Sequence, residues 1–410
     1  MSRSSSAKSL RIIADDLTGA ADTAASWVSR FGSVELFLAS TDVALEAAAA
    51  SIDLNSRQMS AEGAFRAVSA AADALSRCGA GRFQFYKKVD SALRGHIAVE
   101  TKAFLDASPS IQAAMVAPAF PAMGRTVVGG HAFDRGARLQ HVNESLQGQF
   151  VQVAGRREEV VSLDLQAIRS GRQALRRTID RGLQSGARYF LVDAEEDDDL
   201  KAAIEGFDHL RETLLYAGSA GLARVMAGGA PPRHRLCGPT LVVAGSHNRT
   251  TLSQLEALRA DPAISFMAIE HCHTTSRLTE IEAQALGNQA RKALESGRDV
   301  VLCLDGNSAA VAVDEPALAI NLAKIAGHAI GAAKAIMLTG GDTARSVLGA
   351  IGVRQLTVLG EVCVGLPFCS ARGLASPICL KSGGFGGANL LLDLLREARN
   401  AARPVSGQTA

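Results

Sequence analysis

The sequence has almost no net charge and no apolar run of the roughly 18 residues that cross a bilayer. Its 43 Lys and Arg residues nearly balance 41 Asp and Glu residues, which leaves a formal charge of +2 over 410 residues. No strong field therefore favours nucleic acid or an anionic membrane, and we expect neither as a partner. The opening MSRSSSAKS has no apolar core after its basic residues, so we expect residues 1–9 to be a disordered leader rather than a signal peptide, and 401–410 to be a tail.

Several familiar motifs are missing as well. The seven cysteines include no CxxC pair, which favours reduced thiols and a cytoplasmic location. The HCH triplet at 271–273 has no second ligand cluster, so we predict no metal site. The chain lacks the GxxxxGK[ST] phosphate loop and the HRD and DFG motifs of protein kinases, so these phosphoryl-transfer templates do not apply.

Apolar strand-like runs alternate with Ala- and Leu-rich helical stretches, which predicts an α/β fold with largely parallel sheets covered on both faces. The length favours two domains. Gly and Pro interrupt both periodicities at 227–239, so we predict domains at 10–228 and 240–400 with a linker at 229–239. The irregular segment from 118 to about 149 predicts a long functional loop or a small excursion from the sheet. We expect strands at 11–14, 34–39, 82–87, 113–117, 189–194, 240–245, 300–304, 335–338, 355–360 and 377–381.

Two adjacent carboxylates, Asp15 and Asp16, follow the first predicted strand and precede a helix. In open α/β sheets, ligands bind beyond the carboxyl ends of the strands, which gives such residues weight. Thr18 and Gly19 lie where backbone N–H groups could receive an anion. Neighbouring residues on an extended backbone point to opposite sides, so we expect at most one of the two carboxylates to face the cavity. The alternative is that one Asp merely caps the helix.

Two further strand ends carry cations. The stretch FYKKVDSALRGH places Lys87, Lys88 and Arg94 around Asp90 and Ser91, and VAPAFPAMGR places Arg125 on a loop stiffened by two prolines. Guanidinium groups there suit a small carboxylate or phosphate ligand, although a solvated basic turn is the alternative.

The strand ends of the C-terminal half carry Gly, Ser and Thr instead of charge. Three turns have this character: one with Gly245 and Ser246, one running from Gly340 to Thr343, and one with Gly383 and Gly384. Glycine lets a backbone approach a ligand closely, and N–H groups at a helix start attract phosphate oxygens. Three such turns at one sheet edge predict a nucleotide site.

The sequence resembles the four-carbon acid sugar kinase family. The matching pieces occur in family order from about residue 10 to 390: IIADDLTGAADTA, KKVDSALRGH, APAFPAMGR, VDAEEDDDL, GSAGLAR, VAGSHNRTTLSQL, TGGDTARSVLGAIGV and KSGGFGG. The resemblance implies an N-terminal sugar-acid-binding domain and a C-terminal nucleotide-binding domain, each α/β, with the active site in an interdomain cleft. It also implies ATP-dependent phosphorylation of the terminal hydroxyl of threonate, erythronate or 3-oxo-tetronate.

Asp16 is our candidate for the group that orients and deprotonates the attacking hydroxyl, with Arg94 and Arg125 holding the substrate carboxylate. Magnesium is expected to bridge the phosphates, and Asp342 is a candidate for an indirect contact through water. Oligomeric state is left open, with a homodimer as an option. The substrate-binding positions carried over from the family are Asp15, Lys88, Asp90, Ser91, Arg94, Gly95 and Arg125, and the ATP-contacting positions are Ser246, Gly340, Gly341, Asp342, Thr343, Gly383 and Gly384.

Two departures from the family pattern fall in the substrate half. The usual DSTLRGN reads DSALRGH, with Ala92 and His96, and the segment 131–150 lacks a common DP..P element. Both departures therefore bear on the choice of substrate and not on the use of a nucleotide. The rival functions are a non-catalytic sugar-acid sensor and a dinucleotide-dependent oxidoreductase, and the absence of GxGxxG after a strand counts against the latter.

Overall fold

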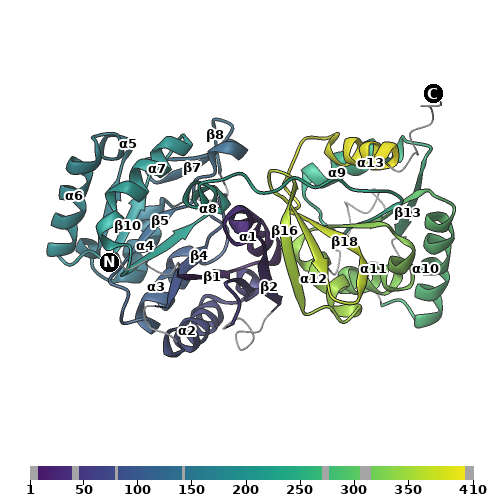
Figure 1. Ribbon diagram of the computed structural model, residues 1–410, viewed down its shortest axis with the longest axis horizontal. Coiled ribbons are helices and arrows are strands. Elements are labelled where there is room, and N and C mark those ends of the chain that lie inside the picture. Colours follow the sequence, from purple (N-terminus) through teal and green to yellow (C-terminus); the bar gives the residue numbers. More distant parts are fainter. Residues whose placement is uncertain are drawn as a thin grey trace, which may run out of the picture. The chain divides into compact units, whose positions relative to one another are not determined.

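The computed structural model describes residues 8–38, 46–78, 82–140, 144–269, 277–304 and 315–401. Contacts divide the chain into two units, of which the first ends at Pro231 and the second begins at Pro232. In each unit helices flank a central sheet (Figure 1), which confirms the predicted α/β class. The HCH triplet, most of the expected leader and residues 402–410 lie outside the described residues.

The first unit contains a sheet in which all eight strands run parallel. Strand β1 lies in its interior, and its residues are buried except the first. The order across the sheet is β2 (Val34–Leu38), β3 (Ala49–Asp53), β1 (Ser9–Ala14), β4 (Phe83–Lys88), β11 (Leu214–Gly218), β5 (Ala113–Ala117), β10 (Tyr189–Val192) and β9 (Val160–Leu163).

The helices of the first unit cover both faces of this sheet. From β1 the chain crosses to β2 on one side, and from β3 it crosses to β4 on the other, so right-handed crossovers place α1 and α2 on opposite faces. α2, α3 and α4 form one row, and α1, α8, α7 and α6 form a second. The helices are α1 (Leu17–Phe31), α2 (Ala61–Arg77), α3 (Ile97–Ala107), α4 (Leu146–Ala154), α5 (Leu165–Ile168), α6 (Arg172–Gln184), α7 (Asp197–Gly206) and α8 (Ala220–Ala227).

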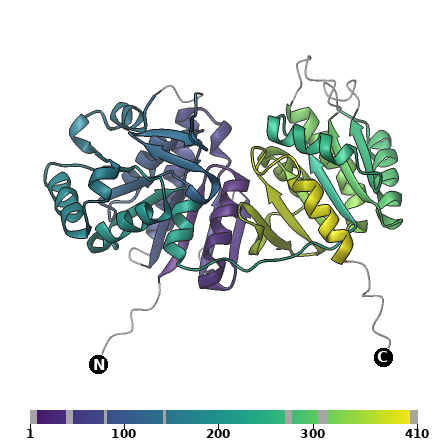
Figure 2. The same ribbon diagram turned by 90° about the horizontal axis from the view of Figure 1, so that it is seen from above.

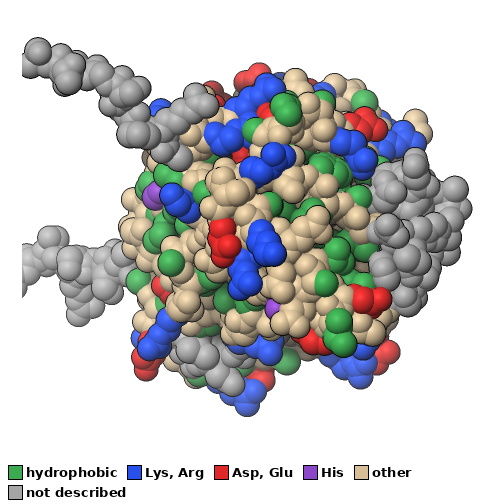
Figure 3. All heavy atoms as spheres, turned by 90° about the vertical axis from the view of Figure 1, so that its right-hand side faces the viewer, with side chains coloured by type: hydrophobic (Ala, Val, Ile, Leu, Met, Phe, Trp, Pro, Cys, Tyr) green, Lys and Arg blue, Asp and Glu red, His purple; other side chains and the backbone are tan. Residues whose placement is uncertain are grey.

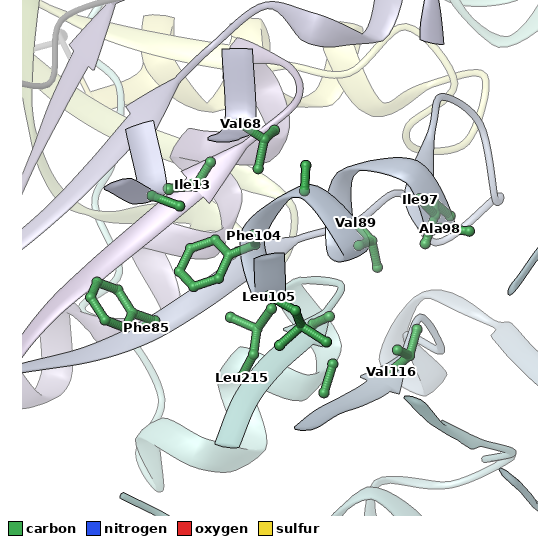
Figure 4. Packing of buried hydrophobic residues seen from close by; sticks show 14 of the residues in the cluster. Ile13, Val68, Phe85, Val89, Ile97, Ala98, Phe104, Leu105, Val116 and Leu215 are labelled. Atoms are coloured by element: carbon green, nitrogen blue, oxygen red, sulfur yellow. The ribbon is translucent and has the colours of Figure 1, made fainter. Parts of the chain in front are cut away.

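Figure 4 shows part of the core beneath α2 and α3, where Phe85 of β4 meets Phe104 of α3 edge to face at 5.3 Å. The acidic run 193–199 follows β10 and leads into α7. There Glu196 and Asp199 form a reciprocal capping box.

The irregular segment after β5 is an excursion from the main sheet. It forms a three-stranded antiparallel sheet of β6 (Arg125–Val128), β7 (His131–Asp134) and β8 (Ala137–Arg138). The carboxylate of Asp193 accepts hydrogen bonds from the N–H groups of Gly129 and Gly130 and so ties the β6–β7 turn to the end of β10.

The sheet of the second unit has five parallel strands, extended at one edge by two further strands through antiparallel pairing. The order is β13 (Ile264–Ile269), β14 (Asp299–Leu304), β12 (Thr240–Ala244), β15 (Ala335–Thr339), β18 (Leu374–Lys381), β17 (Leu366–Ala371) and β16 (Gln355–Cys363). The helices are α9 (Arg249–Arg259), α10 (Glu280–Glu295), α11 (Glu315–Ala329), α12 (Gly341–Ala350) and α13 (Leu390–Ala401).

α10, α11 and α12 pack in one row, and α9 packs against α13, which is the yellow helix of Figure 2. The face of the second unit in Figure 3 carries Lys and Arg side chains interspersed with Asp and Glu, in keeping with the small net charge. Within the described part of the chain, no helix has the length and apolarity needed to span a membrane.

Candidate functional site

The carboxyl end of β1 lies at a topological switch point, because the chain leaves β1 toward β2 and leaves β3 in the opposite direction toward β4. Asp15 and Asp16 directly follow this strand end. Asp16 is the N-cap of α1, where Oδ1 accepts a hydrogen bond from the Gly19 N–H at 3.2 Å and Oδ2 accepts one from the Thr18 hydroxyl at 2.6 Å. The alternative raised by the sequence, that an Asp caps the helix, is confirmed for Asp16. The cap does not exclude a further role for this carboxylate.

Arg57 binds both carboxylates. Its Nε and Nη2 donate to Asp15 at 2.7 and 3.0 Å, and Nη2 also donates to Asp16 Oδ1 at 2.7 Å. The opposite orientations expected of these neighbouring residues are therefore wrong, whereas the expectation that at most one of the two carboxylates faces a cavity stays a prediction. The strand ends at Ala14, so the alternation of an extended strand does not govern them.

Arg57 was not among the residues predicted from the sequence. It lies in a 3₁₀ turn, Ser56–Gln58, four residues beyond the end of β3, and the Ala-rich β3 was not among the predicted strands. A basic residue shortly after a strand adjacent to β1 was the available signal.

Asp90 organises the turn after β4. Arg94 donates to its carboxylate through Nε and Nη2 at 2.9 and 2.8 Å, and the Ala92 and Arg94 N–H groups donate to Oδ2. Arg57 Nη2 lies 3.6 Å from Asp90 Oδ1, which joins this turn to the carboxylates after β1. We call Asp15, Asp16, Arg57, Asp90 and Arg94 the charged cluster.

Electrostatics keep the buried carboxylates of the charged cluster ionised. Burial alone would raise the pKa of Asp15, but the positive charges of Arg57, Lys88 and Lys87 outweigh burial and lower it. Burial likewise opposes ionisation of Asp90, and Arg57 and Arg94 more than compensate, so the pKa of Asp90 is lowered. Burial alone would lower the pKa of Arg57, but the charges of Asp16, Asp15 and Asp90 outweigh burial and raise it.

The two lysines at the end of β4 have different surroundings. Lys88 Nζ lies beside the first turn of α1, because a Cβ at Gly19 would come within 2.7 Å of it and within 2.5 Å of Asp16 Oδ1. Lys87 is fully buried and pairs with Glu100 of α3 at 2.7 Å, so it does not join the basic turn that the sequence suggested.

Among the remaining predicted substrate residues, Gly95 joins the charged cluster and Arg125 does not. A Cβ at Gly95 would lie 3.1 Å from Asp15 Oδ2, and its φ of +81° favours glycine. Ser91 lies on the same turn and is partly exposed. Arg125 begins β6, where its Nε lies 3.2 Å from Asp134 Oδ1, and its backbone pairs with Phe120 in the turn before the small antiparallel sheet.

In the second unit, the predicted glycine turns meet at one sheet edge. β12, β15 and β18 are neighbouring parallel strands, so the turns that follow them are adjacent. A Cβ added to Gly383 would lie 2.3 Å from Ser246 Oγ, and one added to Gly340 would lie 3.4 Å from Ser246 Cβ. A methyl group at Gly383 would therefore displace the Ser246 hydroxyl, and at Gly340 the φ of +97° favours glycine.

Two helices begin in this cluster of turns. α12 starts at Gly341 after Gly340, which has φ +97° and no side chain to cap the helix, so the first N–H groups of α12 receive no side-chain cap. Asp342 is exposed in that first turn, and Thr343 is buried close to Gly245. α9 begins beside Gly384, whose Cβ would lie 3.4 Å from Asn248 Nδ2. An uncapped helix start among close backbone turns is an arrangement that binds phosphate oxygens.

Comparisons with known proteins also divide the chain into an N-terminal and a C-terminal part with different ligands. A family model described as a sugar-binding N-terminal domain matches residues 10–226, and one described as a nucleotide-binding C-terminal domain matches residues 241–391. A D-threonate kinase from Cupriavidus necator is 32% identical, with 92% of this chain and 94% of the relative covered. A D-threonate kinase from Bordetella bronchiseptica is 28% identical, with 95% and 98% covered. A 3-oxo-tetronate kinase from Brucella melitensis is 26% identical, with 92% and 93% covered.

Two solved structures share the fold. A Salmonella typhimurium protein has a TM-score of 0.72 at 22% identity, covering 96% of this chain and 99% of its own. A Haemophilus influenzae protein has a TM-score of 0.71 at 22% identity, covering 96% of this chain and all of its own. With both domain models matched in order and 32% identity to a kinase over most of its length, the chain belongs to the four-carbon acid sugar kinase family.

Proposed function

We propose that the protein is an ATP-dependent kinase that phosphorylates the terminal hydroxyl of a four-carbon sugar acid of the threonate, erythronate or 3-oxo-tetronate type. The observation that carries the proposal is the presence of two complementary sites in one chain of this family. One is a charged cluster at the switch point of the first sheet, and the other is a set of glycine turns around an uncapped helix start in the second. The names of the relatives support a substrate of this class.

Asp16 is the residue we propose to orient and deprotonate the attacking hydroxyl. A carboxylate offers about four lone-pair positions. Three hydrogen bonds engage Asp16, two at Oδ1 and one at Oδ2, so Oδ2 can accept one more, from a substrate hydroxyl. Asp15 is less suited, because Arg57 holds it through two bonds and its side chain is only 4% exposed.

Arg94 is the residue we propose to bind the substrate carboxylate. Its Nε and Nη2 each donate one hydrogen bond to Asp90, and its side chain is 46% exposed. A guanidinium carries five N–H donors, so Nη1 can bind an acid without release of Asp90. We propose that Asp90 acts through Arg94, and that Arg125 reaches the acid from the antiparallel sheet only if it exchanges its contact with Asp134.

ATP would bind the turns at Ser246, Gly340–Thr343 and Gly383–Gly384, with its phosphates on the first N–H groups of α12. No group of three or more potential ligand side chains suited to a metal occurs in the part of the chain that the structure describes. Magnesium usually binds phosphates with one or two carboxylates, and the exposed Asp342 fits that limited role. We propose a cytoplasmic location, with residues 10–228 and 240–400 as the two functional domains.

A coupled ADP-release assay over the stereoisomers of threonate, erythronate and 3-oxo-tetronate tests this function. We expect ADP release that requires one of these acids. Binding of an acid without ADP release under ATP would refute the kinase proposal and support the sensor alternative.

A further inference from the structure

Lys381 is a buried cation that the proposed chemistry does not yet use. It is the last residue of β18, directly before the turn with Gly383 and Gly384, and it is 0% exposed. None of the ion pairs between described residues includes Lys381. Burial lowers its pKa to about 7, because an ammonium group loses hydration in the protein interior. Burial of an amine without hydrogen bonds is unfavourable, so Lys381 requires hydrogen-bond acceptors around Nζ.

The partners of Lys381 are backbone carbonyls of the turn itself. Its Nζ donates to Ser382 O at 3.0 Å and makes a longer contact with Gly383 O at 3.5 Å. Thr251 of α9 reinforces the second carbonyl, because its hydroxyl donates to Gly383 O at 2.7 Å. The carbonyl groups of two successive peptides therefore face the ammonium group beneath the turn.

The orientation of these carbonyls fixes the orientation of two N–H groups. In a planar trans peptide the N–H points opposite to the C=O. The Ser382–Gly383 and Gly383–Gly384 peptides therefore direct the N–H groups of Gly383 and Gly384 away from Lys381. Neither N–H group donates a hydrogen bond to another described residue, and successive N–H groups of this kind form an anion-binding concavity.

We propose that Lys381 is a positioning residue of the nucleotide site, which holds the 382–384 turn so that the Gly383 and Gly384 N–H groups bind the phosphates of ATP. The lysine acts from below and does not touch the nucleotide. Lys381 is also linked to the start of α12, the other proposed phosphate-binding element, because the Gly340 N–H donates to Lys381 O at 2.9 Å. The inference rests on the proposed ATP-dependent function and names a determinant of its nucleotide affinity.

The test compares Lys381→Met with Lys334→Met, a matched change at an exposed lysine of the same unit. Calorimetry should show that Lys381→Met weakens ATP binding at least tenfold and leaves adenosine binding within twofold, because adenosine lacks phosphates. Lys334→Met should match the wild type for both ligands. Equal losses for ATP and adenosine in a folded Lys381→Met protein, or ATP affinity within twofold of wild type, would overturn the inference.

A second measurement decides the matter if Lys381→Met does not fold. In wild-type protein labelled with ¹⁵N-glycine, addition of ATP should shift the amide resonances of Gly383 and Gly384, whereas adenosine should shift them little. Unchanged amides in ATP-saturated protein would overturn the inference. Wild-type protein that neither binds ATP nor releases ADP would instead refute the proposed function itself.

Discussion

Replacement of Arg57 by methionine removes the cation that contacts Asp15, Asp16 and Asp90 while it preserves much of the apolar stem. The three hydrogen bonds of 2.7 to 3.0 Å to Asp15 and Asp16 are lost, and the Arg57 side chain is only 16% exposed. Removal of one partner from a buried ion pair costs about 3–5 kcal/mol, because the remaining charge loses its compensation. We expect a loss of this size in the free energy of unfolding of the first unit at pH 7.

The effect should depend on pH in a defined direction. In the wild type, the pKa values of Asp15 and Asp90 are lowered, so these groups contribute stability above the ordinary Asp range that is lost as pH falls through their folded pKa. Loss of Arg57 removes the charge that lowers the pKa of Asp15 most strongly, while burial still raises it, so the pKa of Asp15 should be higher in the variant than in the wild type. The variant then takes up the proton at a higher pH than the wild type, and the difference in the free energy of unfolding between them should shrink on acidification.

Urea unfolding followed by tryptophan fluorescence measures this loss. Trp27 is the single tryptophan of the chain and is fully buried in α1, the helix that Asp16 caps, so it reports on the first unit. Arg66→Met is the matched control, since Arg66 forms an exposed pair with Glu62 and should contribute less than about 0.5 kcal/mol. A loss below about 1 kcal/mol at pH 7, or one that does not change with pH, would refute the electrostatic reasoning.

Three further predictions concern single positions. Asp16→Asn keeps a capping oxygen on α1, so ATP affinity should be unchanged while kcat falls at least about 100-fold; turnover within threefold of wild type would remove the role of Asp16. Gly383→Ala brings a methyl group to 2.3 Å from Ser246 Oγ. In steady-state kinetics the KM for ATP should rise at least about tenfold, while the KM for the acid stays unchanged. An equal rise in both KM values would contradict a role of Gly383 in ATP binding. Lys87→Met leaves Glu100 buried without its ion-pair partner and should lower the free energy of unfolding by about 3–5 kcal/mol in the Trp27 assay. The Lys87→Met, Glu100→Gln double variant should recover most of that loss, because it removes the uncompensated charge and keeps an acceptor for the Ser56 hydroxyl.

The sequence predicts the fold class well, because long apolar runs mark buried parallel strands. The ten predicted strands all occur, but β3, β9, β11, β13 and β17 were missed along with the small antiparallel sheet. β3 reads AASID, and its alanines favour a helix as much as a strand, so only its place between β1 and β2 makes it extended. The pairing of such segments with neighbouring strands makes them extended, and a single sequence does not show that pairing.

The candidate sites show the same limit. Spacing along the chain predicted that the turns with Ser246, Gly340 and Gly383 lie together, since each follows a strand and the parallel topology brings strand ends together. It did not identify Arg57, whose importance depends on the neighbouring positions of β3 and β1 in space. It also misjudged Lys87, because adjacent residues at the end of β4 face opposite sides and only Lys88 lies beside α1.

The charge count of the proposed acid site has a consequence for selectivity. Three carboxylates, on Asp15, Asp16 and Asp90, are matched by three cations on Arg57, Lys88 and Arg94. A sum of zero means that these six groups together exert little long-range pull on passing anions, so we expect citrate, phosphate and other abundant acids to gain no general advantage there. We expect a four-carbon sugar acid to be distinguished by the fit of its hydroxyl and carboxylate groups to the positions still open on Asp16 and Arg94, so that discrimination depends on stereochemistry more than on charge.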